Sequence, residues 1–344
     1  EDMEKRIIKK ENLAGLVKKL AAERTVYAPV MEGDNVVYAA LENGKEPLLE
    51  YGNTKDAPKN LFFPQAETLL RFLRTNRGME LKEDETGKAK EVVLFGVRPC
   101  DARSFVLLDS LFDQEQWKDP YYIERRKKTT VISRGCVHPP YSTCFCTSVG
   151  GHPLSTEGAD ILLTDLGDAY LAEFLTPKGE KLLEKWGDLP KADDAAASKK
   201  KDLSAKAESE IKSKIPGKEI KPWLDANFEH PFWDTIHKSC LACGTCTYLC
   251  PTCHCFDITD EMKREDGKRV RSWDSCMYWL FTQETSGHNP RTSQKQRWRQ
   301  RLMHKFKYFV DNFNAIACVG CGRCVMYCPV NIDIRKIVTD ISKL

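Results

Sequence analysis

The sequence has no long hydrophobic run and no excess of one charge. No stretch of its 344 residues reaches the about 18 apolar residues that a membrane-spanning helix needs. No basic-then-apolar pattern of a secretory signal peptide follows Glu1. Lysine and arginine number 53, and aspartate and glutamate number 50, a formal net charge of +3. We therefore expect no membrane span, and the charge balance does not support a nucleic-acid partner.

Common nucleotide-binding and hydrolytic motifs are also missing. No Gly-x-Gly-x-x-Gly motif follows a predicted strand and there is no P-loop; the nearest glycine pair, Gly320 and Gly322, lies inside a cysteine motif. No nucleophilic-serine elbow and no His-Glu-x-x-His zinc helix occur. The sequence thus offers no recognisable site at which a nucleotide or substrate delivers electrons.

Cysteine, in contrast, is abundant, with fifteen residues. Eight of them form two runs with the spacing C-x2-C-x2-C-x3-C-P, the pattern that holds [4Fe-4S] clusters in bacterial ferredoxins. The first run is Cys240, Cys243, Cys246 and Cys250, and the second is Cys318, Cys321, Cys324 and Cys328. In such proteins the fourth cysteine of each run ligates the other cluster. We therefore expect Cys328 to complete the first site and Cys250 the second.

Disulfides and structural zinc explain this pattern less well. Disulfides need an oxidising compartment, and structural zinc is usually held by two separate C-x2-C pairs. Neither predicts a doubled four-cysteine register that ends in proline. Because clusters need reduced thiolates, the expected location is the cytoplasm.

Four further cysteines lie in the amino-terminal part. Cys100 follows a predicted strand, and Cys136, Cys144 and Cys146 share a turn-rich loop. Four thiols suffice for a third iron-sulfur cluster, and Arg98 can donate hydrogen bonds to its sulfurs. Zinc or purely structural thiols are the alternatives.

The remaining cysteines and a basic run have several interpretations. Cys253, Cys255 and Cys276 are expected to be small buried side chains against a cluster, with His254 as a hydrogen-bonding neighbour. A further metal site is the alternative, although no fourth ligand has an obvious register. A run of basic residues without an acid lies between Arg291 and Lys307. It is by default a solvated helix face; nucleic-acid binding, cluster tuning and docking of an acidic partner are the alternatives.

The expected fold class is α+β, with a mixed α/β domain over 1–186, a charged linker over 187–221 and an all-helical dicluster ferredoxin domain over 222–344. Apolar periodicity predicts helices at Ile7–Leu20, Ala102–Phe112 and Pro177–Trp186. Strands are expected at Thr25–Val30, Asn35–Leu41, Glu91–Gly96, Thr129–Ser133, Ile161–Thr164 and Tyr170–Phe174. The carboxy-terminal part is predicted to contain a helix that leads to Cys318 and a final helix capped by Asn331 or Asp333.

Several longer phrases resemble a known family. They are LFFPQAETLLRF (Leu61–Phe72), GVRPCDARSF (Gly96–Phe105), TCFCTSVGG (Thr143–Gly151), CPTCHCFDI, RSWDSC, HNPR and the ending ACVGCGRCVMYCPVNIDI. Together they resemble the beta subunits of cytoplasmic NiFe sulfhydrogenases and the 4Fe-4S dicluster electron-transfer subunits of anaerobic sulfite reductases, over nearly the whole chain.

The resemblance implies an electron-transfer subunit of a hetero-oligomer. A flavin-containing sister subunit oxidises NAD(P)H, this subunit relays single electrons, and a terminal catalytic subunit of the sulfite reductase, NiFe hydrogenase or heterodisulfide reductase type uses them. The competing interpretations are a stand-alone flavin-dependent iron-sulfur oxidoreductase and a cluster-based sensor. Two adjacent cubane sites favour conduction, because a sensor needs only one.

Overall fold

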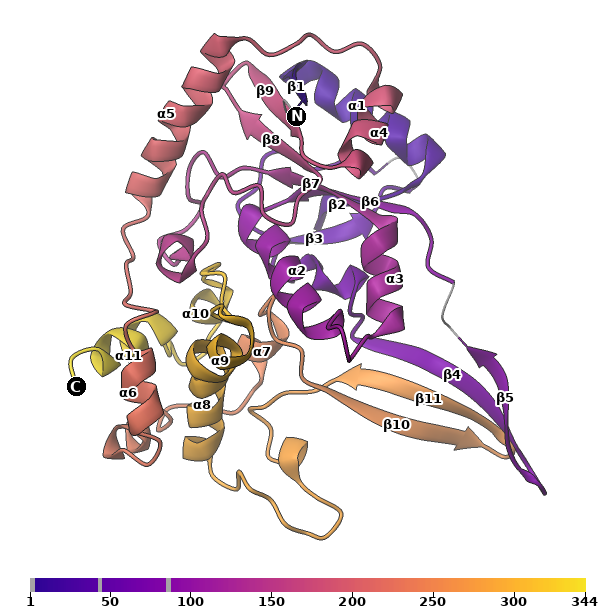
Figure 1. Cartoon of the computed structure of the whole chain (residues 1–344), viewed down its shortest axis with the longest axis vertical. Coiled ribbons are helices and arrows are strands. Elements are labelled where there is room, and N and C mark those ends of the chain that lie inside the picture. The colour runs from indigo at the N-terminus through magenta and orange to yellow at the C-terminus, as the bar shows by residue number, and fades with distance from the viewer. Residues whose placement is uncertain (1–3, 43–44, 85–87) are drawn as a thin grey trace.

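The computed structural model describes residues 4–42, 45–84 and 88–344. Its larger sheet has seven strands in the order β1-β9-β8-β7-β6-β2-β3 (Figure 1). These are β1 (Glu4–Lys9), β2 (Thr25–Glu32), β3 (Asn35–Ala40), β6 (Val92–Val97), β7 (Thr129–Arg134), β8 (Ile161–Asp165) and β9 (Ala169–Phe174). The central strands β2, β6, β7 and β8 are parallel, and β3, β9 and β1 extend the sheet with antiparallel pairing.

Helices cover both faces of this sheet. The helices concerned are α1 (Lys10–Glu23), α2 (Pro99–Phe112), α3 (Pro120–Lys128) and α4 (Pro177–Trp186). Leu13 of α1 and Leu182 of α4 pack with Phe95 in one apolar cluster, whereas α2 and α3 pack with the neighbouring Leu94 in another. Because side chains alternate along a strand, β6 is buried on both faces. The expected mixed α/β architecture is confirmed for this part of the chain.

The expected helix Ile7–Leu20 begins later than predicted. Ile7 and Ile8 pair with Leu171 and Tyr170 of β9, so these residues belong to an edge strand, and α1 starts at Lys10. The apolar spacing was compatible with both conformations, and pairing with a distant strand decided between them.

A second, four-stranded antiparallel sheet has the order β10-β11-β4-β5 and projects as an arm (Figure 1). It joins β4 (Ala66–Thr75) and β5 (Gly78–Asp84) to β10 (Phe256–Lys263) and β11 (Asp266–Trp273). The carboxy-terminal part is therefore not all-helical, which corrects the expectation above. Every residue of β10 is exposed and most are polar, so the hairpin lacks the apolar alternation that signals a strand. The expected domain division stays a prediction, with this sheet built from both sides of it.

The rest of the chain consists of helices joined by irregular segments, of which 274–293 is a long one. It contains α5 (Asp194–Glu210), α6 (Lys221–Ala226), α7 (Thr245–Tyr248), α8 (Gln294–Met303), a π-helical segment (His304–Tyr308), α9 (Phe309–Phe313), α10 (Arg323–Met326) and α11 (Ile334–Ile341). The charged stretch 187–221 thus contains the helix α5, which runs along one side of the molecule (Figure 1). The side chain of Asp333 caps α11 by accepting a hydrogen bond from Arg335 N, as one of the two predicted caps.

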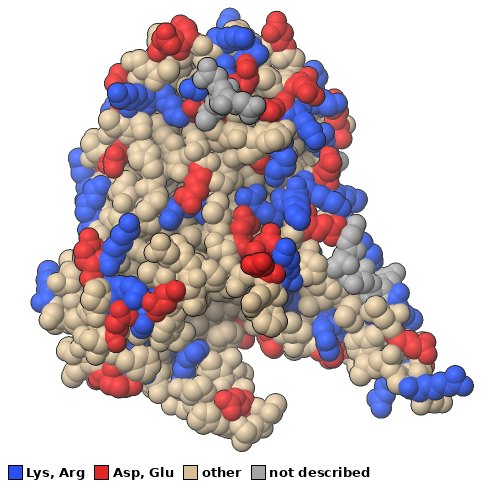
Figure 2. Space-filling view, viewed as in Figure 1, with Lys and Arg blue, Asp and Glu red and all other residues tan. Residues whose placement is uncertain are grey.

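Within the described residues, no helix combines the length and the apolar character that crossing a membrane requires. On the face shown in Figure 2, basic and acidic side chains are interspersed. That face carries no large patch of one sign of the kind that marks nucleic-acid binding.

Candidate iron-sulfur centres

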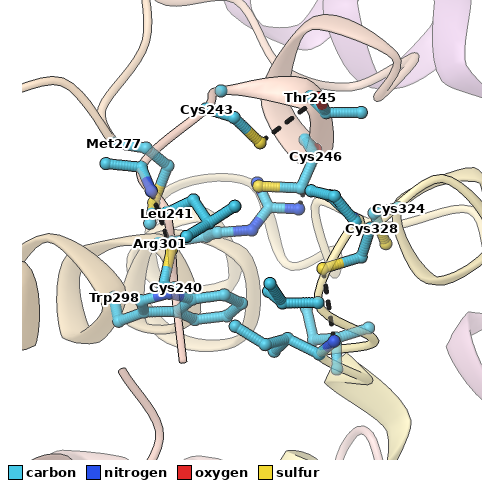
Figure 3. Close-up of a pocket in the computed structure, with 16 residues that line it drawn as sticks. Cys240, Leu241, Cys243, Thr245, Cys246, Met277, Trp298, Arg301, Cys324 and Cys328 are labelled. Carbon is cyan, nitrogen blue, oxygen red and sulfur yellow. Dashed lines mark hydrogen bonds between the residues drawn. The ribbon is translucent and has the colours of Figure 1, made fainter. Parts of the chain in front are cut away.

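Cys240, Cys243 and Cys246 line one cavity together with Cys328 (Figure 3). The fourth cysteine of the second motif thus reaches the three leading cysteines of the first, as the predicted exchange requires. Met277, Trp298 and Ile334 supply apolar walls, which lower the local dielectric constant around the thiols. We call these four cysteines the first set.

The backbone around the middle cysteine of each motif has the same unusual conformation. Ala242 and Gly244 flank Cys243 with φ of 55° and 73°, and Gly320 and Gly322 flank Cys321 with φ of 65° and 77°. Left-handed residues alternating with right-handed ones turn successive N–H groups inward and form an anion-binding concavity typical of iron-sulfur sites. Ala242 N donates to Cys240 Sγ at 3.4 Å. The repeated turn shows that the two motifs fold locally in the same way.

The second set comprises Cys318, Cys321, Cys324 and Cys250. Burial raises the pKa of the Cys321 thiol to about 12, and the proximity of Cys250 also raises it. Burial is also the main cause that raises the pKa of Cys318 and Cys324, with Cys250 contributing in both cases. Buried thiols of this kind ionise only when a cation replaces the proton. The second set therefore has the chemistry of a metal-cluster site. Cys250 lies close enough to influence its other three thiols, and its role as the fourth ligand stays a prediction.

Two residues of the basic run are buried next to these sulfurs. Lys305, 4% exposed, donates from Nζ to Cys250 Sγ at 3.3 Å and to Ala317 O at 2.8 Å. Arg301, 2% exposed, donates to Cys246 O at 2.9 Å. The default interpretation, a solvated helix face, is therefore wrong for these two residues. Their contacts support the cluster-tuning alternative, because nearby positive charge favours the reduced cluster.

The four amino-terminal cysteines also converge. One cavity is lined by Cys100 in the first turn of α2, Cys136 after β7, and Cys144 and Cys146 in the following loop. Because β6 and β7 are adjacent and parallel, the segments that follow them meet at the same sheet edge, where α/β proteins commonly bind ligands. We call these cysteines the amino-terminal set.

Arg98 lies at this cavity as predicted. Its Nη1 is 3.9 Å from Cys136 Sγ, and its Nε donates to Gly52 O at 2.8 Å. The guanidinium also stacks on the ring of Tyr51, 4.4 Å from its centroid. These contacts hold the positive charge toward the cysteine sulfur.

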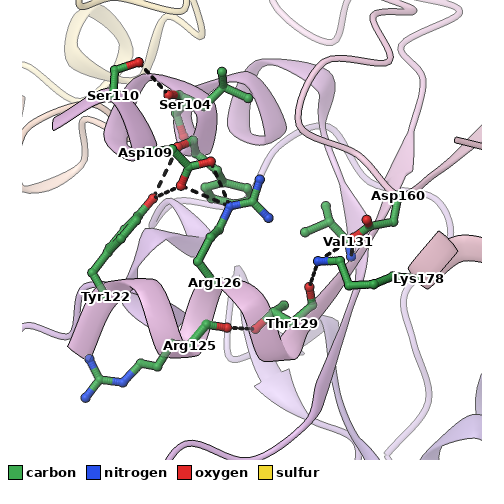
Figure 4. Close-up of polar contacts among 12 residues, drawn as sticks. Ser104, Asp109, Ser110, Tyr122, Arg125, Arg126, Thr129, Val131, Asp160 and Lys178 are labelled. Carbon is green, nitrogen blue, oxygen red and sulfur yellow. Dashed lines mark hydrogen bonds and ion pairs between the residues drawn. The ribbon is translucent and has the colours of Figure 1, made fainter. Parts of the chain in front are cut away.

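Polar contacts between α2 and α3 hold the helix that carries Cys100 (Figure 4). Asp109 accepts hydrogen bonds from Tyr122 OH at 2.7 Å and from Arg126 Nε at 3.2 Å. Burial raises the pKa of Asp109, although the Arg126 charge lowers it. A helix fixed in this way keeps the Cys100 thiol in one position against the sheet edge.

A buried ion pair joins the amino-terminal set to the second motif. Arg323 Nη1 and Nη2 donate to Asp101 Oδ1 at 2.6 Å and to Asp101 Oδ2 at 2.8 Å. Arg323 also donates to Thr54 O at 2.9 Å. The sequence did not predict this contact, because Asp101 and Arg323 are far apart in the chain. A single charged residue is usually exposed, so neither residue by itself indicates a buried pair. The pair fixes Cys100 relative to Cys321.

The three sets are contiguous. Cys324 of the second set also lines the cavity of the first, and Cys321 lines the cavity of the amino-terminal set. Gly320 makes the closest approach: a Cβ atom there would lie 2.4 Å from Cys146 N, and its carbonyl accepts from Phe145 N at 2.8 Å. The second set therefore lies between the other two.

The residues present fit iron-sulfur clusters better than single metal ions. Within 4–42, 45–84 and 88–344 no group of three or more histidine, cysteine, aspartate or glutamate side chains is placed to hold one ion, so the zinc alternative loses support. The buried Arg301 Nε has no hydrogen-bond partner among the described residues, although it borders the first cavity. A cluster sulfide in that cavity is an acceptor that such a group needs.

Comparisons with known proteins agree with this geometry. Residues 239–332 match the 4Fe-4S dicluster domain family. The chain is 30% identical over 322 residues to the Sulfhydrogenase 2 subunit beta of Pyrococcus furiosus, an alignment that covers 92% of each chain. No solved structure matches. The chain is an iron-sulfur electron-transfer subunit, and it belongs to the sulfhydrogenase beta subunit family.

Proposed function

We propose that this chain relays single electrons between a flavin-containing subunit that oxidises NAD(P)H and a terminal catalytic subunit. The terminal subunit is of the NiFe hydrogenase, sulfite reductase or heterodisulfide reductase type, and the assembly is a cytoplasmic hetero-oligomer. The relationship to a sulfhydrogenase beta subunit supports this assignment. A nicotinamide supplies two electrons as hydride, so a flavin has to stand between it and one-electron carriers.

The observation that carries the proposal is the contiguity of the three cysteine sets. The first and second sets hold one [4Fe-4S] cluster each, and the amino-terminal set holds a third. Once bound, an iron-sulfur cluster accepts and releases one electron at a time. Because Cys324 and Cys321 each border a neighbouring cavity, the thiols form an unbroken series from the first set to the amino-terminal set.

Side chains and backbone N–H groups around the cysteines stabilise the negative charge that a cluster gains when it is reduced. Lys305 and Arg98 point their cationic groups at Cys250 of the central set and at Cys136 of the amino-terminal set. Inward-facing N–H groups around Cys243 and Cys321 act in the same direction. All of these groups raise the reduction potential relative to a site without them.

The first set lies nearest to the surface. Cys243 is exposed, and Leu241 is 65% exposed beside it. Tyr278 OH donates to Cys243 O at 3.3 Å, and the chain that follows exposes Trp279 and Leu280. An exposed apolar rim of this kind is typical of a protein interface. We therefore infer that a redox partner approaches the first set here.

Substitution of the central set tests the relay. Cys321→Ser removes a ligand of the second set, so electron flow from NAD(P)H to the terminal acceptor is lost while dye reduction by the flavin subunit is spared. Met326→Ala, at an exposed position inside the second motif that lines neither the first cavity nor the amino-terminal one, keeps both activities. Terminal activity that survives in a Cys321→Ser complex lacking the second cluster contradicts the relay. An isolated chain that retains flavin and turns over by itself supports the stand-alone alternative.

A further inference from the structure

Three cysteines outside the relay share a cavity of their own. Cys253 and Cys255 follow the first motif, and Cys276 follows β11, yet all three line one small cavity. Cys276 is buried, and Cys253 and Cys255 are partly buried. The sequence favoured a role as small buried side chains over a further metal site, because no fourth ligand was evident. Their convergence from two different segments instead has the form of a ligand set.

Three buried cations surround this cavity. Lys59 is 2% exposed and donates from Nζ to Cys253 O at 2.7 Å. Arg301 Nη1 lies 3.7 Å from Cys253 Sγ, and Arg301 and Lys305 both line the cavity. Among the described residues none of these three cations has a carboxylate in ion-pair contact. Arg301 and Lys305 also contact the first and second sets, whereas the hydrogen bond of Lys59 is to Cys253 O. A buried charge without a countercharge is costly, so Lys59 in particular favours an anionic group in this region.

The helix beside the cavity has an irregular turn at the same place. His304 and Lys305 begin a π-helical segment, and both side chains line the cavity. Single π-helical turns inside α-helices frequently mark functional sites. The irregular turn brings an imidazole to a cavity that already has three thiols, which makes four possible ligands in total.

We propose that Cys253, Cys255 and Cys276 hold a fourth iron-sulfur cluster, with the His304 imidazole as its fourth ligand. A cluster bound by thiolates is anionic and supplies a countercharge for Lys59, in addition to the charge that the first and second clusters provide for Arg301 and Lys305. A single zinc ion fits less well, because no three of these side chains are placed to share one ion. With this site, all fifteen cysteines of the chain belong to one of four sets.

The fourth site adjoins the second set. Lys305 and Thr252 line its cavity and also contact Cys250 Sγ, at 3.3 Å and 3.2 Å. A cluster there exchanges electrons with the centre of the relay, so it forms a side branch. The branch role rests on the proposed function, whereas metal binding by these residues does not.

Metal analysis of the anaerobically purified complex tests the site. Cys276→Ser is expected to lose about four iron and four sulfide per copy of this chain, the content of one [4Fe-4S] cluster. The matched variant Cys136→Ser should lose the same amount of iron and sulfide from the amino-terminal site. The double variant should lose the iron and sulfide of both sites. Unchanged iron in a folded Cys276→Ser complex overturns the proposal. A Cys255–Cys276 disulfide in the wild-type complex, found by mass spectrometry, also overturns it.

A second measurement decides the matter if Cys276→Ser does not fold. Pulsed paramagnetic resonance of the reduced wild-type complex should show a strongly coupled imidazole nitrogen, and His304→Gln should lose this coupling. A wild-type complex without any histidine nitrogen coupling overturns the proposed ligand set. Neither readout depends on turnover, so failure of the relay and failure of this site are distinguishable.

Discussion

Lys305→Met removes the cation that contacts the second set most directly. Its ammonium group lies 3.3 Å from Cys250 Sγ and is almost fully buried. Methionine keeps much of the side-chain volume but removes the charge and the hydrogen bonds to Cys250 and Ala317. Because a positive charge stabilises the added electron, the reduction potential of the second cluster should become more negative.

The structure gives the order of magnitude. Two unit charges at the 3.3 Å between Nζ and Sγ interact by about 5 kcal/mol at an effective dielectric constant of about 20. The added electron spreads over the whole cluster, so we take about half, or about 2.5 kcal/mol. Since about 1.4 kcal/mol corresponds to 59 mV for a one-electron couple, the potential should fall by about 100 mV.

A redox titration of the anaerobic complex, followed by paramagnetic resonance, measures this shift. Lys307→Met is the matched control, because Lys307 belongs to the same basic run but pairs with Asp225 and Asp311 at the surface. The Lys307→Met substitution should change the reduction potential of the second cluster only slightly, because solvent and salt screen surface charges. A Lys305→Met potential that is unchanged or more positive refutes the assigned role of Lys305.

Three further substitutions test the contacts between the sets. Gly322→Ala places a Cβ 2.4 Å from Thr143 Oγ1 at a φ of 77°. The free energy of unfolding, measured by thermal denaturation, should therefore fall by about 3 kcal/mol. Arg323→Met leaves Asp101 buried without its partner, which should cost about 3–5 kcal/mol in the same assay. Arg98→Met removes the cation beside Cys136 and should make the potential of the amino-terminal cluster more negative in a redox titration.

Each substitution has a control on this chain. Gly287→Ala has a similar φ of 85° but open space around it, so it should be less destabilising than Gly322→Ala. Arg269→Met breaks an exposed ion pair with Asp260 and should leave stability nearly unchanged. If Arg323→Met and Arg269→Met lower the free energy of unfolding equally, the buried Arg323–Asp101 pair has no special structural role. Arg98→Met with an unaltered potential removes Arg98 from the amino-terminal site.

Local patterns predicted much of the fold and most of the candidate site. The helix Pro177–Trp186 has the predicted bounds, because its apolar spacing and amino-terminal proline act within one segment. The spacing of the two cysteine runs predicted that Cys250 and Cys328 exchange sets, and Cys328 does line the cavity of the first motif. Counting thiols also identified the amino-terminal set, since four ligands are what a cluster needs.

Features that depend on distant contacts were not predictable in the same way. The hairpin β10–β11 is exposed along β10, and its position follows from pairing with β4 rather than from its own pattern. Arg301 and Lys305 lie in a run that is basic on several helix faces, so their burial depends on the thiols packed against them. Cys276 lies far from Cys255 in sequence, and only the folded chain shows that they share a cavity.

Paramagnetic resonance of the anaerobically prepared complex after dithionite reduction tests the central claim most directly. The contiguous cysteine sets predict signals of [4Fe-4S] clusters that are magnetically coupled to one another, and Cys321→Ser should simplify the spectrum by removing the central partner. Cysteine sets filled with zinc, or a reduced complex without coupled cluster signals from this chain, would contradict the account.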